Sequence, residues 1–315
     1  MIPQSEVPRR ARTGRLFLGL GIGLLFLVGT FARGIAGFYT DYLWFNSLDF
    51  TSLWSGVILA KVGLFLAALG GFFVLCWGNL LLAERLAPAI RPAGPEEATL
   101  AEVRELLDRR PGTVRIGIAL LLAFIFGSGA AGRWNEWILF RNHVSFGVDD
   151  PQFGRDIGFY VFQLPFLAAL TNVLFSALVV TLIVTAVAHY VNGGIRFQIP
   201  GRHVTPAVKA HLSVLMATIA LVKAGNYFLD RFALAFSTRG AVQGATYTDV
   251  NAQLPALNLL IVISIVAALL FLVSIRRSGW ALPITAVGLW GLVAVVAGSV
   301  YPTVVQRFRV EPAES

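Results

Sequence analysis

Apolar residues dominate seven long stretches of this chain, and polar residues collect between them. Most stretches reach about 20 residues, the length of helix that crosses a hydrocarbon core of about 30 Å. Backbone amides in lipid must be paired within the structure, and these stretches lack the alternation of barrel strands. The pattern predicts an all-α fold, an integral membrane seven-helix bundle. The stretches are Leu16 to Phe31, Leu53 to Leu82, Ile116 to Ala131, Leu164 to His189, Val208 to Leu229, Leu257 to Ile275 and Trp280 to Val300.

Two of these stretches are short for a membrane span, the first and the third. Each continues into mildly polar sequence, Ala32 to Tyr39 after the first and Gly132 to Phe140 after the third. Such an extension completes a tilted helix or turns along the membrane interface. The sequence leaves both outcomes open.

Charge supports the membrane assignment and predicts an orientation. Only 13% of residues are charged and 57% are hydrophobic, whereas a soluble domain has about 25% charged residues. In a soluble protein the net charge of +8 would indicate nucleic acid, but here most basic residues lie on one side of the predicted bundle. That side is predicted to be cytoplasmic, with the N-terminus inside and the C-terminus outside. Its basic residues are Arg9, Arg10, Arg12, Arg15, Arg85, Arg91, Arg104, Arg109, Arg110, Arg115, Arg196, Arg202, Lys209, Arg276 and Arg277.

The seven spans predict one transmembrane domain, residues 1–302, and 303–315 begin an extracytoplasmic segment. The domain has a cytoplasmic loop at 83–115 and outer loops at 132–163 and 230–256. In the cytoplasmic loop, Thr99 and Glu102 have the spacing of a capping box, which predicts a short amphipathic helix. Its apolar face is expected to lie on the membrane or the bundle, or else to dock a partner.

No catalytic motif is present: the chain has no glycine-rich phosphate loop, nucleophile elbow or zinc-protease signature. We therefore expect a non-enzymatic protein without a cofactor. The single cysteine, Cys76, lies inside the second stretch and is expected to serve packing. Three histidines, His189, His203 and His211, flank one predicted loop. They have no acidic or thiol partner nearby, so interfacial histidines are favoured over a metal site.

Three carboxylates in the first outer loop, Asp149, Asp150 and Asp156, form a second candidate site. Their clustering suits calcium, but calcium needs six to eight oxygen ligands and the spacing is not that of a calcium loop. A helix cap or a salt-bridged turn is the favoured interpretation, and no metal is predicted. The aromatic residues of Asp149 to Phe166 predict that this loop is ordered against the membrane surface and the bundle.

Lys61 and Lys223 are the clearest ionisable residues inside the predicted spans. A charge in a membrane is costly, so each is a candidate for function. One interpretation is a site for an anion or lipid phosphate, with Asn226 and Asp230 on the same helical face as Lys223. The other is that Lys61 extends to the headgroups and Lys223 pairs with Asp230, which we favour. None of the 17 acidic residues lies mid-span, which argues against an ion-driven transporter.

Small residues at four-residue spacing predict places where helices approach closely. The pairs are Gly19 with Gly23, Ala67 with Gly71 and Ala294 with Gly298. Packing within the chain is favoured over contacts between copies, and the oligomeric state stays open.

Four strings of residues carry a resemblance to a known family. They are DYLWF (41–45), DPQFGRDIGFYVFQLPF (150–166), YTDVNAQLPAL (247–257) and YPTVVQRFRVEP (301–312). In this order they resemble the bacterial membrane proteins of uncharacterised protein family 0182, over nearly the whole chain. The resemblance implies a multi-pass protein of the bacterial plasma membrane. It also implies seven N-terminal transmembrane helices followed by a large extracytoplasmic region, and an activity that is not established.

Two functions follow as hypotheses. The first is a non-enzymatic anchor or scaffold at the cell envelope, with the lipid bilayer, envelope proteins or anionic lipid as partners and no nucleic acid. The alternative is a carrier or conduit for an anionic or lipidic substrate that uses Lys61 and Lys223. The direction in which these two lysines point separates the hypotheses.

Overall fold

The computed structural model describes residues 9–88, 110–195, 204–238, 244–277, 279 and 281–310, with the side chains of 9–20 and 27 left out. Within these residues the fold is all-α, as predicted, and its only β features are two isolated bridges. Seven helices are long and apolar enough to cross a membrane. The α-helices are α1 (Arg9–Ser47), α2 (Thr51–Arg85), α4 (Pro111–Ala131), α5 (Trp134–Arg141), α6 (Leu164–Val191), α7 (Pro206–Ala233), α8 (Leu254–Ser274), α9 (Ala281–Val295) and α10 (Tyr301–Val305). Wider π-helical turns at Phe159–Gln163, Asp249–Gln253, Val296–Val300 and Gln306–Val310 extend several of these helices.

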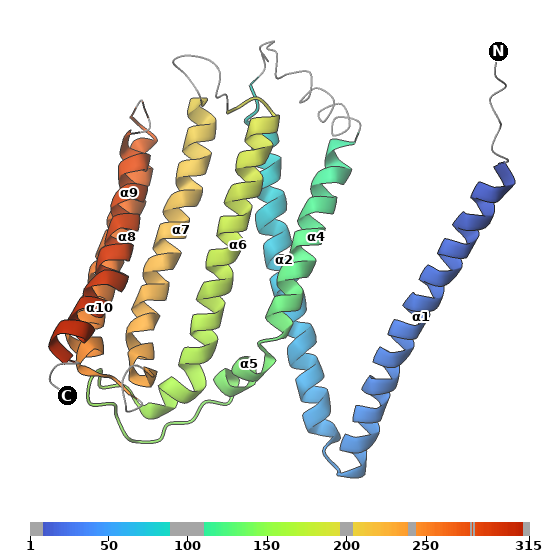
Figure 1. Ribbon diagram of the computed structural model, residues 1–315, viewed down its shortest axis with the longest axis horizontal. Coiled ribbons are helices and arrows are strands. Elements are labelled where there is room, and N and C mark those ends of the chain that lie inside the picture. Colours follow the sequence, from blue (N-terminus) through green and yellow to red (C-terminus); the bar gives the residue numbers. More distant parts are fainter. Residues whose placement is uncertain are drawn as a thin grey trace. The chain divides into compact units, whose positions relative to one another are not determined.

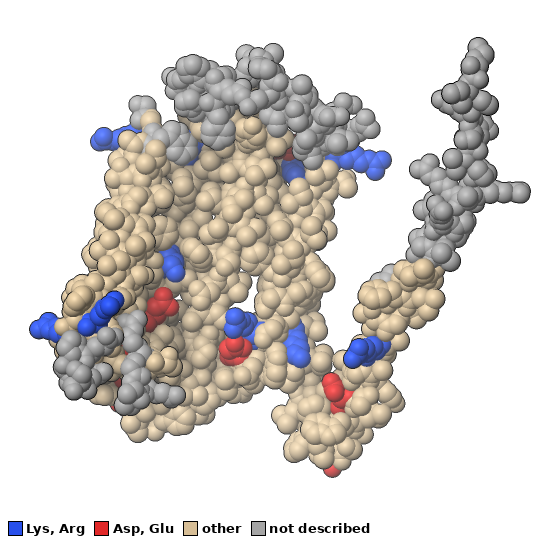
Figure 2. Space-filling view, in the orientation of Figure 1, with Lys and Arg blue, Asp and Glu red and all other residues tan. Residues whose placement is uncertain are grey.

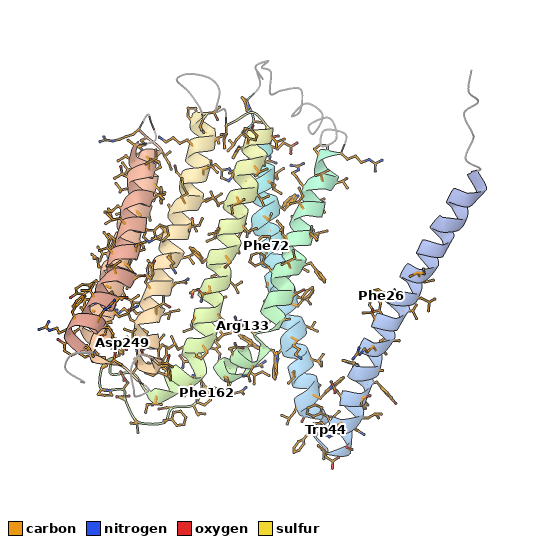
Figure 3. All side chains as sticks on the ribbon, in the orientation of Figure 1. Phe26, Trp44, Phe72, Arg133, Phe162 and Asp249 are labelled. Carbon is orange, nitrogen blue, oxygen red and sulfur yellow. The ribbon has the colours of Figure 1, made fainter. Side chains whose placement is uncertain are left out.

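The chain divides into two compact units, Met1–Leu59 and Ala60–Ser315. In the first unit α1 continues to Ser47, well beyond the predicted end of its apolar stretch at Phe31. The polar residues after Phe31 include no proline, so nothing breaks the helix there. Tyr42 and Phe38 of α1 pack on Trp54, with ring centroids 5.3 and 4.8 Å from it. Phe26 and Trp44 mark the course of α1 in Figure 3.

A Schellman turn ends α1. The amide of Phe50 donates to the carbonyl of Phe45 at 2.9 Å, and the amide of Asp49 donates to the carbonyl of Asn46 at 3.2 Å. This pairing requires a left-handed residue after the helix, and Asp49 has φ of 59°. Asp49 is the only non-glycine residue with positive φ among the described residues.

We expect Asp49→Gly to stabilise this turn by about 0.5 kcal/mol, because glycine adopts the left-handed conformation without a Cβ penalty. Asp49→Ala should destabilise it by about 1 kcal/mol for the opposite reason. Thermal unfolding of both variants in the same lipid tests the sign. Equal shifts for glycine and alanine would show that the side chain of Asp49, not its backbone, governs the turn.

In the second unit the long helices lie side by side, with α4, α6, α7 and α9 appearing in this order across Figure 1. One core cluster joins α2, α4 and α6 through Phe72, Cys76, Ala123 and Ala177. A second joins α7, α8 and α9, and Phe271 of α8 is its largest member. Cys76 is 1% exposed and belongs to the first core, as its position in the second stretch predicted.

The third predicted stretch does not extend beyond Ala131. The chain turns at Gly132 and Arg133, and α5 follows as a separate helix. Aromatic contacts then hold α5 to the start of α6: the rings of Trp137 and Phe140 lie 5.2 and 5.0 Å from that of Phe166. Of the two outcomes left open by the sequence, the turn is therefore the correct one here.

Close helix packing depends on a different set of small residues from the predicted pairs. Ala119, Ala123, Gly127 and Ala130 form the buried stripe of α4. A Cβ added at Gly127 would lie 3.0 Å from both the ring and the carbonyl oxygen of Phe65 in α2. Among the predicted glycines, Gly23 and Gly71 have no such neighbour within 4 Å. A Cβ at Gly298 would lie 3.6 Å from Leu260, an ordinary contact.

We expect Gly127→Val to destabilise the second unit by about 1–3 kcal/mol, the usual cost of overpacking a core. Gly129→Val is the matched control, because it makes the same change two residues along α4 where no atom lies within 4 Å of the added Cβ. The comparison of their thermal unfolding midpoints removes the shared effect on helix propensity. Equal midpoints would show that α2 yields at this crossing without cost.

Most charged residues lie near the two ends of the helices, and the band between them on the face shown in Figure 2 is largely uncharged, with one basic patch inside it. We call the end that carries α5 the α5 end, and the opposite end, where α2 ends and α4 begins, the His189 end. Arg133, Phe162 and Asp249 lie at the α5 end in Figure 3. An ion pair between Glu84 and Arg115 joins α2 and α4 at the His189 end. The predicted helix with its capping box at Thr99 and Glu102 lies outside the described residues.

Candidate functional site

The first outer loop is built around the carboxylate of Asp156. Its two oxygens accept hydrogen bonds from the Ser145 hydroxyl at 2.5 Å and from the amides of Phe146, Gly147 and Gly158 at 3.1, 2.9 and 2.6 Å. Hydrogen bonds to the charged form favour ionisation. The Ser145 hydroxyl and these amides accordingly lower the pKa of Asp156 to about 2. The carboxylate of Asp156 thus holds the conformation of the loop by accepting these hydrogen bonds.

The carboxylate of Asp150 also accepts hydrogen bonds within the loop. It accepts one from the amide of Phe153 at 2.7 Å and one from the hydroxyl of Tyr160 at 3.1 Å. Asp149 pairs with Asp156 through the backbone as an isolated bridge. Asp150 and Asp156 thus accept hydrogen bonds within the turn, and no ion pair of the three carboxylates occurs among the described residues. In the same part of the chain there is no group of three or more His, Cys, Asp or Glu residues that could hold a metal.

The same loop packs on the bundle, as its aromatic residues predicted. Phe153 and Phe159 each meet the ring of Phe232 in α7, at 5.1 and 5.2 Å between centroids. The guanidinium of Arg155 lies over Phe159 and Phe232, at 5.4 and 5.7 Å from their centroids. Tyr160 is 4% exposed within this cluster. The loop thereby joins the start of α6 to the end of α7.

The second outer loop is held by side-chain hydrogen bonds that were not predicted from the sequence. Thr246 and Asp249 form a capping box: the Thr246 hydroxyl and amide donate to the Asp249 carboxylate at 2.7 and 3.0 Å, and the Asp249 amide donates back to that hydroxyl at 3.3 Å. The signal was available, since a threonine three residues before an acidic residue opens the apolar stretch. Next to it, the Thr248 hydroxyl donates to Oε1 of Gln306 at 2.6 Å. The third and fourth family strings therefore meet at the α5 end.

Each membrane lysine lies against its own aromatic rings. The ammonium of Lys61 is 5.2 Å from the centre of the Trp134 ring in α5. The ammonium of Lys223 is 4.6 Å from Tyr227 and 5.3 Å from Phe175 in α6. Such cation–π contacts shelter an ammonium with little hydrogen bonding. The two ammonium groups therefore have separate aromatic partners.

The other two members of this candidate site lie near Lys223. The side chain of Asn226 is 3% exposed and donates to Asn172 of α6 at 3.0 Å. Asp230 is near enough for its charge to interact with Lys223. However, no ion pair within 4.0 Å joins Lys223 and Asp230 among the described residues. The predicted local pairing is therefore a longer-range interaction without a direct contact.

His189 and His211 belong to a partly buried hydrogen-bonded cluster, and the sequence indicated only the loop near which they lie. Nε2 of His189 in α6 lies 3.0 Å from Nδ1 of His211 in α7, and Nε2 of His211 lies 2.8 Å from Oδ1 of Asn79 in α2. The amide nitrogen of Asn79 donates to the carbonyl of Leu75 at 2.7 Å. Three helices are thus joined by one hydrogen-bonded chain. His203 lies outside the described residues.

Lys209 connects two helices through buried hydrogen bonds, a role that the sequence did not predict. It is 8% exposed, and its ammonium donates to the carbonyl oxygens of Arg277 and Gly279 at 2.7 and 2.6 Å. These carbonyls follow α8, where backbone acceptors lack helical partners. Lys209 therefore holds the α8–α9 turn to the start of α7.

These elements define a helical, multi-pass membrane protein with seven helices long and apolar enough to cross a membrane. The chain belongs to the Uncharacterised protein family (UPF0182), whose model matches residues 18–315. It is 41% identical to the UPF0182 protein of Salinispora arenicola over 319 residues, which cover 99% of this chain and 32% of that protein. It is 42% identical to UPF0182 protein FRAAL6027 of Frankia alni, over 87% of this chain and 27% of that protein.

A further relative is UPF0182 protein SCO5204 of Streptomyces coelicolor, 36% identical over 99% of this chain and 32% of that protein. The chain thus spans about a third of the length of the curated relatives it matches. No solved structure matches it.

Proposed function

We propose that this domain is a non-enzymatic anchor and scaffold of the cell membrane, which presents an ordered surface at the α5 end. The observation that carries the proposal is that loops and side-chain contacts connect the ends of several helices at the α5 end. Asp156 and Asp150 organise the first loop, and that loop packs on Phe232. The contact of Thr248 with Gln306 fixes the start of α8 to the helical turn Gln306–Val310, the last one among the described residues. A scaffold needs such a rigid face.

The length of the relatives agrees with this proposal. About two thirds of each relative lies outside the matched segment, so a membrane domain of this kind has additional chain to support. We propose that this additional chain and envelope proteins are the partners of the α5 end, and that the bilayer surrounds the helices. Any activity of the whole protein would then belong to the additional chain.

The proposed orientation places the His189 end in the cytoplasm and the α5 end outside. It rests on the excess of basic residues in the loops of the His189 end. Cysteines introduced singly at Arg277 and Arg155 in the Cys76→Ala background should react with an impermeant thiol reagent from opposite sides, and so should cysteines at Arg15 and Arg155. Arg239 and Ser315 are predicted to lie on the same side as Arg155. Labelling of residues 277 and 155 from one side would contradict the orientation.

The alternative, a carrier or conduit for an anionic or lipidic substrate, has one observation in its favour. Oδ1 of Asn226 is buried without a protein partner, one turn from the Lys223 ammonium. An unpaired acceptor beside a cation in a membrane favours a polar guest. The separate aromatic partners of Lys61 and Lys223 weaken this alternative, because a shared anion site requires the two amines to converge.

Reconstitution separates the two functions. Proteoliposomes that contain the chain are loaded with a fluorescent anionic phospholipid in one leaflet, or with a small fluorescent anion in the lumen. The scaffold proposal expects lipid exchange and anion release at the rate of empty liposomes. Faster transfer that Lys223→Met abolishes, with the protein still folded, would replace the scaffold by the carrier.

A further inference from the structure

A line of polar side chains follows the buried face of α6. Thr181, Thr185 and His189 are spaced four residues apart, and each is 0% exposed. Residues four apart on a helix lie above one another on the same face. Three polar atoms along this line have no protein partner: Oγ1 of Thr181, Oγ1 of Thr185 and Nδ1 of His189.

These threonines differ from most other hydroxyl residues of the helices, and Ser264 of α8 is the other buried hydroxyl without a protein partner among the described residues. A hydroxyl in a membrane helix ordinarily donates to the carbonyl four residues earlier. Thr30, Thr40, Ser128, Thr171, Thr218 and Thr303 all do so, at 2.8–3.0 Å. Thr181 and Thr185 do not, although they are more deeply buried than any of these. Their hydroxyl groups are therefore left for a partner other than their own backbone.

The hydrogen bonds among Asn79, His211 and His189 determine which ring nitrogen of His189 carries the proton. The Asn79 amide nitrogen donates to Leu75, so the amide oxygen faces His211, and Nε2 of His211 must be the donor. In the neutral ring, Nδ1 of His211 is then an acceptor, and Nε2 of His189 must donate to it. The remaining atom, Nδ1 of neutral His189, is consequently a lone-pair acceptor that is buried without a protein partner.

We propose that this face of α6 binds a short file of water molecules, held between Nδ1 of His189 and the hydroxyls of Thr185 and Thr181. Side chains four residues apart stand about 5–6 Å from one another at Cβ. One water with two hydrogen bonds of about 2.8 Å bridges such a gap, and a hydroxyl both donates and accepts. Water donates to His189 at one end of the file and bonds the threonine hydroxyls along it.

The unpaired polar atoms on the buried face of α6 stop at Thr181 and at His189, which fits a local binding site and not a channel across the bundle. Toward the α5 end the buried face of α6 continues with Ala177 and Leu178, which offer no polar side chain. At the other end the hydrogen-bonded chain stops at Asn79. Gly194 also packs tightly there, because a Cβ at this position would lie 2.7 Å from Val208 and 3.6 Å from Nδ1 of His189. The site therefore suits small hydrogen-bonding molecules, of which water is the natural occupant.

Water-edited solid-state NMR of the full chain in lipid tests this proposal, with water itself as the probe. Magnetisation from water should reach Thr185 and the ring of His189 although both are buried in the bundle. The variant Thr185→Val should remove one hydroxyl and slow the transfer to His189. Thr218→Val is the matched control, since its hydroxyl already bonds the carbonyl of Val214 and should leave the transfer unchanged.

The ring tautomer gives a second readout that does not depend on the variants. Nitrogen-15 spectra should show a protonated Nε2 and an unprotonated, hydrogen-bonded Nδ1 on His189. Transfer from water to Thr185 and His189 no faster than to Ala123 in the dry core would overturn the proposal. A His189 ring protonated at Nδ1 and bare at Nε2 would also overturn it, because the direction of the chain would then be reversed.

Discussion

Lys209→Met is expected to destabilise the bundle by about 3 kcal/mol, because it removes two hydrogen bonds from a buried ammonium and leaves their carbonyl acceptors unpaired. Those acceptors, the carbonyl oxygens of Arg277 and Gly279, lie in the turn that connects α8 to α9. Methionine fills a similar volume, so the loss reports the polar contacts and not a cavity. The measurement is the thermal unfolding midpoint in lipid nanodiscs, together with proteolysis of the α8–α9 turn.

Lys223→Met is the matched control for this variant. It deletes an ammonium from the same helix, but that ammonium contacts the rings of Tyr227 and Phe175 and donates no hydrogen bond to a carbonyl among the described residues. Cation–π contacts are worth about 0.5–2 kcal/mol, so the loss should be smaller than for Lys209→Met. If Lys223→Met costs as much as Lys209→Met, the two carbonyl contacts are not what makes Lys209 stabilising.

The membrane helices were predictable from sequence because length and apolar composition decide them locally. Each predicted stretch corresponds to a helix of the structure. The ends were less predictable, since they depend on turn chemistry. The left-handed conformation of Asp49 ends α1. A glycine at this position would have predicted that conformation from the sequence, whereas an aspartate does not. The crossing at Gly127 was missed although Ala119, Ala123 and Gly127 have the same four-residue spacing as the predicted pairs, because spacing alone does not tell which face of a helix packs against another helix.

The sequence identified several residues of the candidate sites, but it did not predict which of them contact one another. Sequence alone placed His189 and His211 near one loop, but their hydrogen bond and the link to Asn79, 132 residues away from His211, depend on which helices pack together. The spacing of Thr181, Thr185 and His189 was visible, because three polar residues at four-residue intervals stand out in an apolar stretch. The role of Lys209 was hidden, since a lysine in a cytoplasmic loop is normally interpreted through its charge.

Asp156→Asn is expected to release the first outer loop from its ordered conformation. The variant removes the charge that accepts hydrogen bonds from Ser145, Phe146, Gly147 and Gly158. Amide hydrogen exchange at Phe146, Gly147 and Gly158 should rise sharply, because their amides lose a charged acceptor. Asp149→Asn is the control, as the structure shows no hydrogen bond to that carboxylate among the described residues, and it should leave exchange at these amides unchanged.

The pH dependence of the same loop follows from the ionisation of Asp156. Its pKa is lowered from 3.8 to about 2 by the hydrogen bonds of Ser145 and the loop amides, so folding of the loop favours the charged carboxylate. The stabilisation is complete above the ordinary value and is lost as the pH falls through about 2. Exchange at Gly147 and Gly158, corrected for its intrinsic pH dependence, should therefore stay slow at pH 5 and accelerate between pH 4 and pH 2. An acceleration already complete at pH 5, or none in the acid range, would show that another group holds this loop.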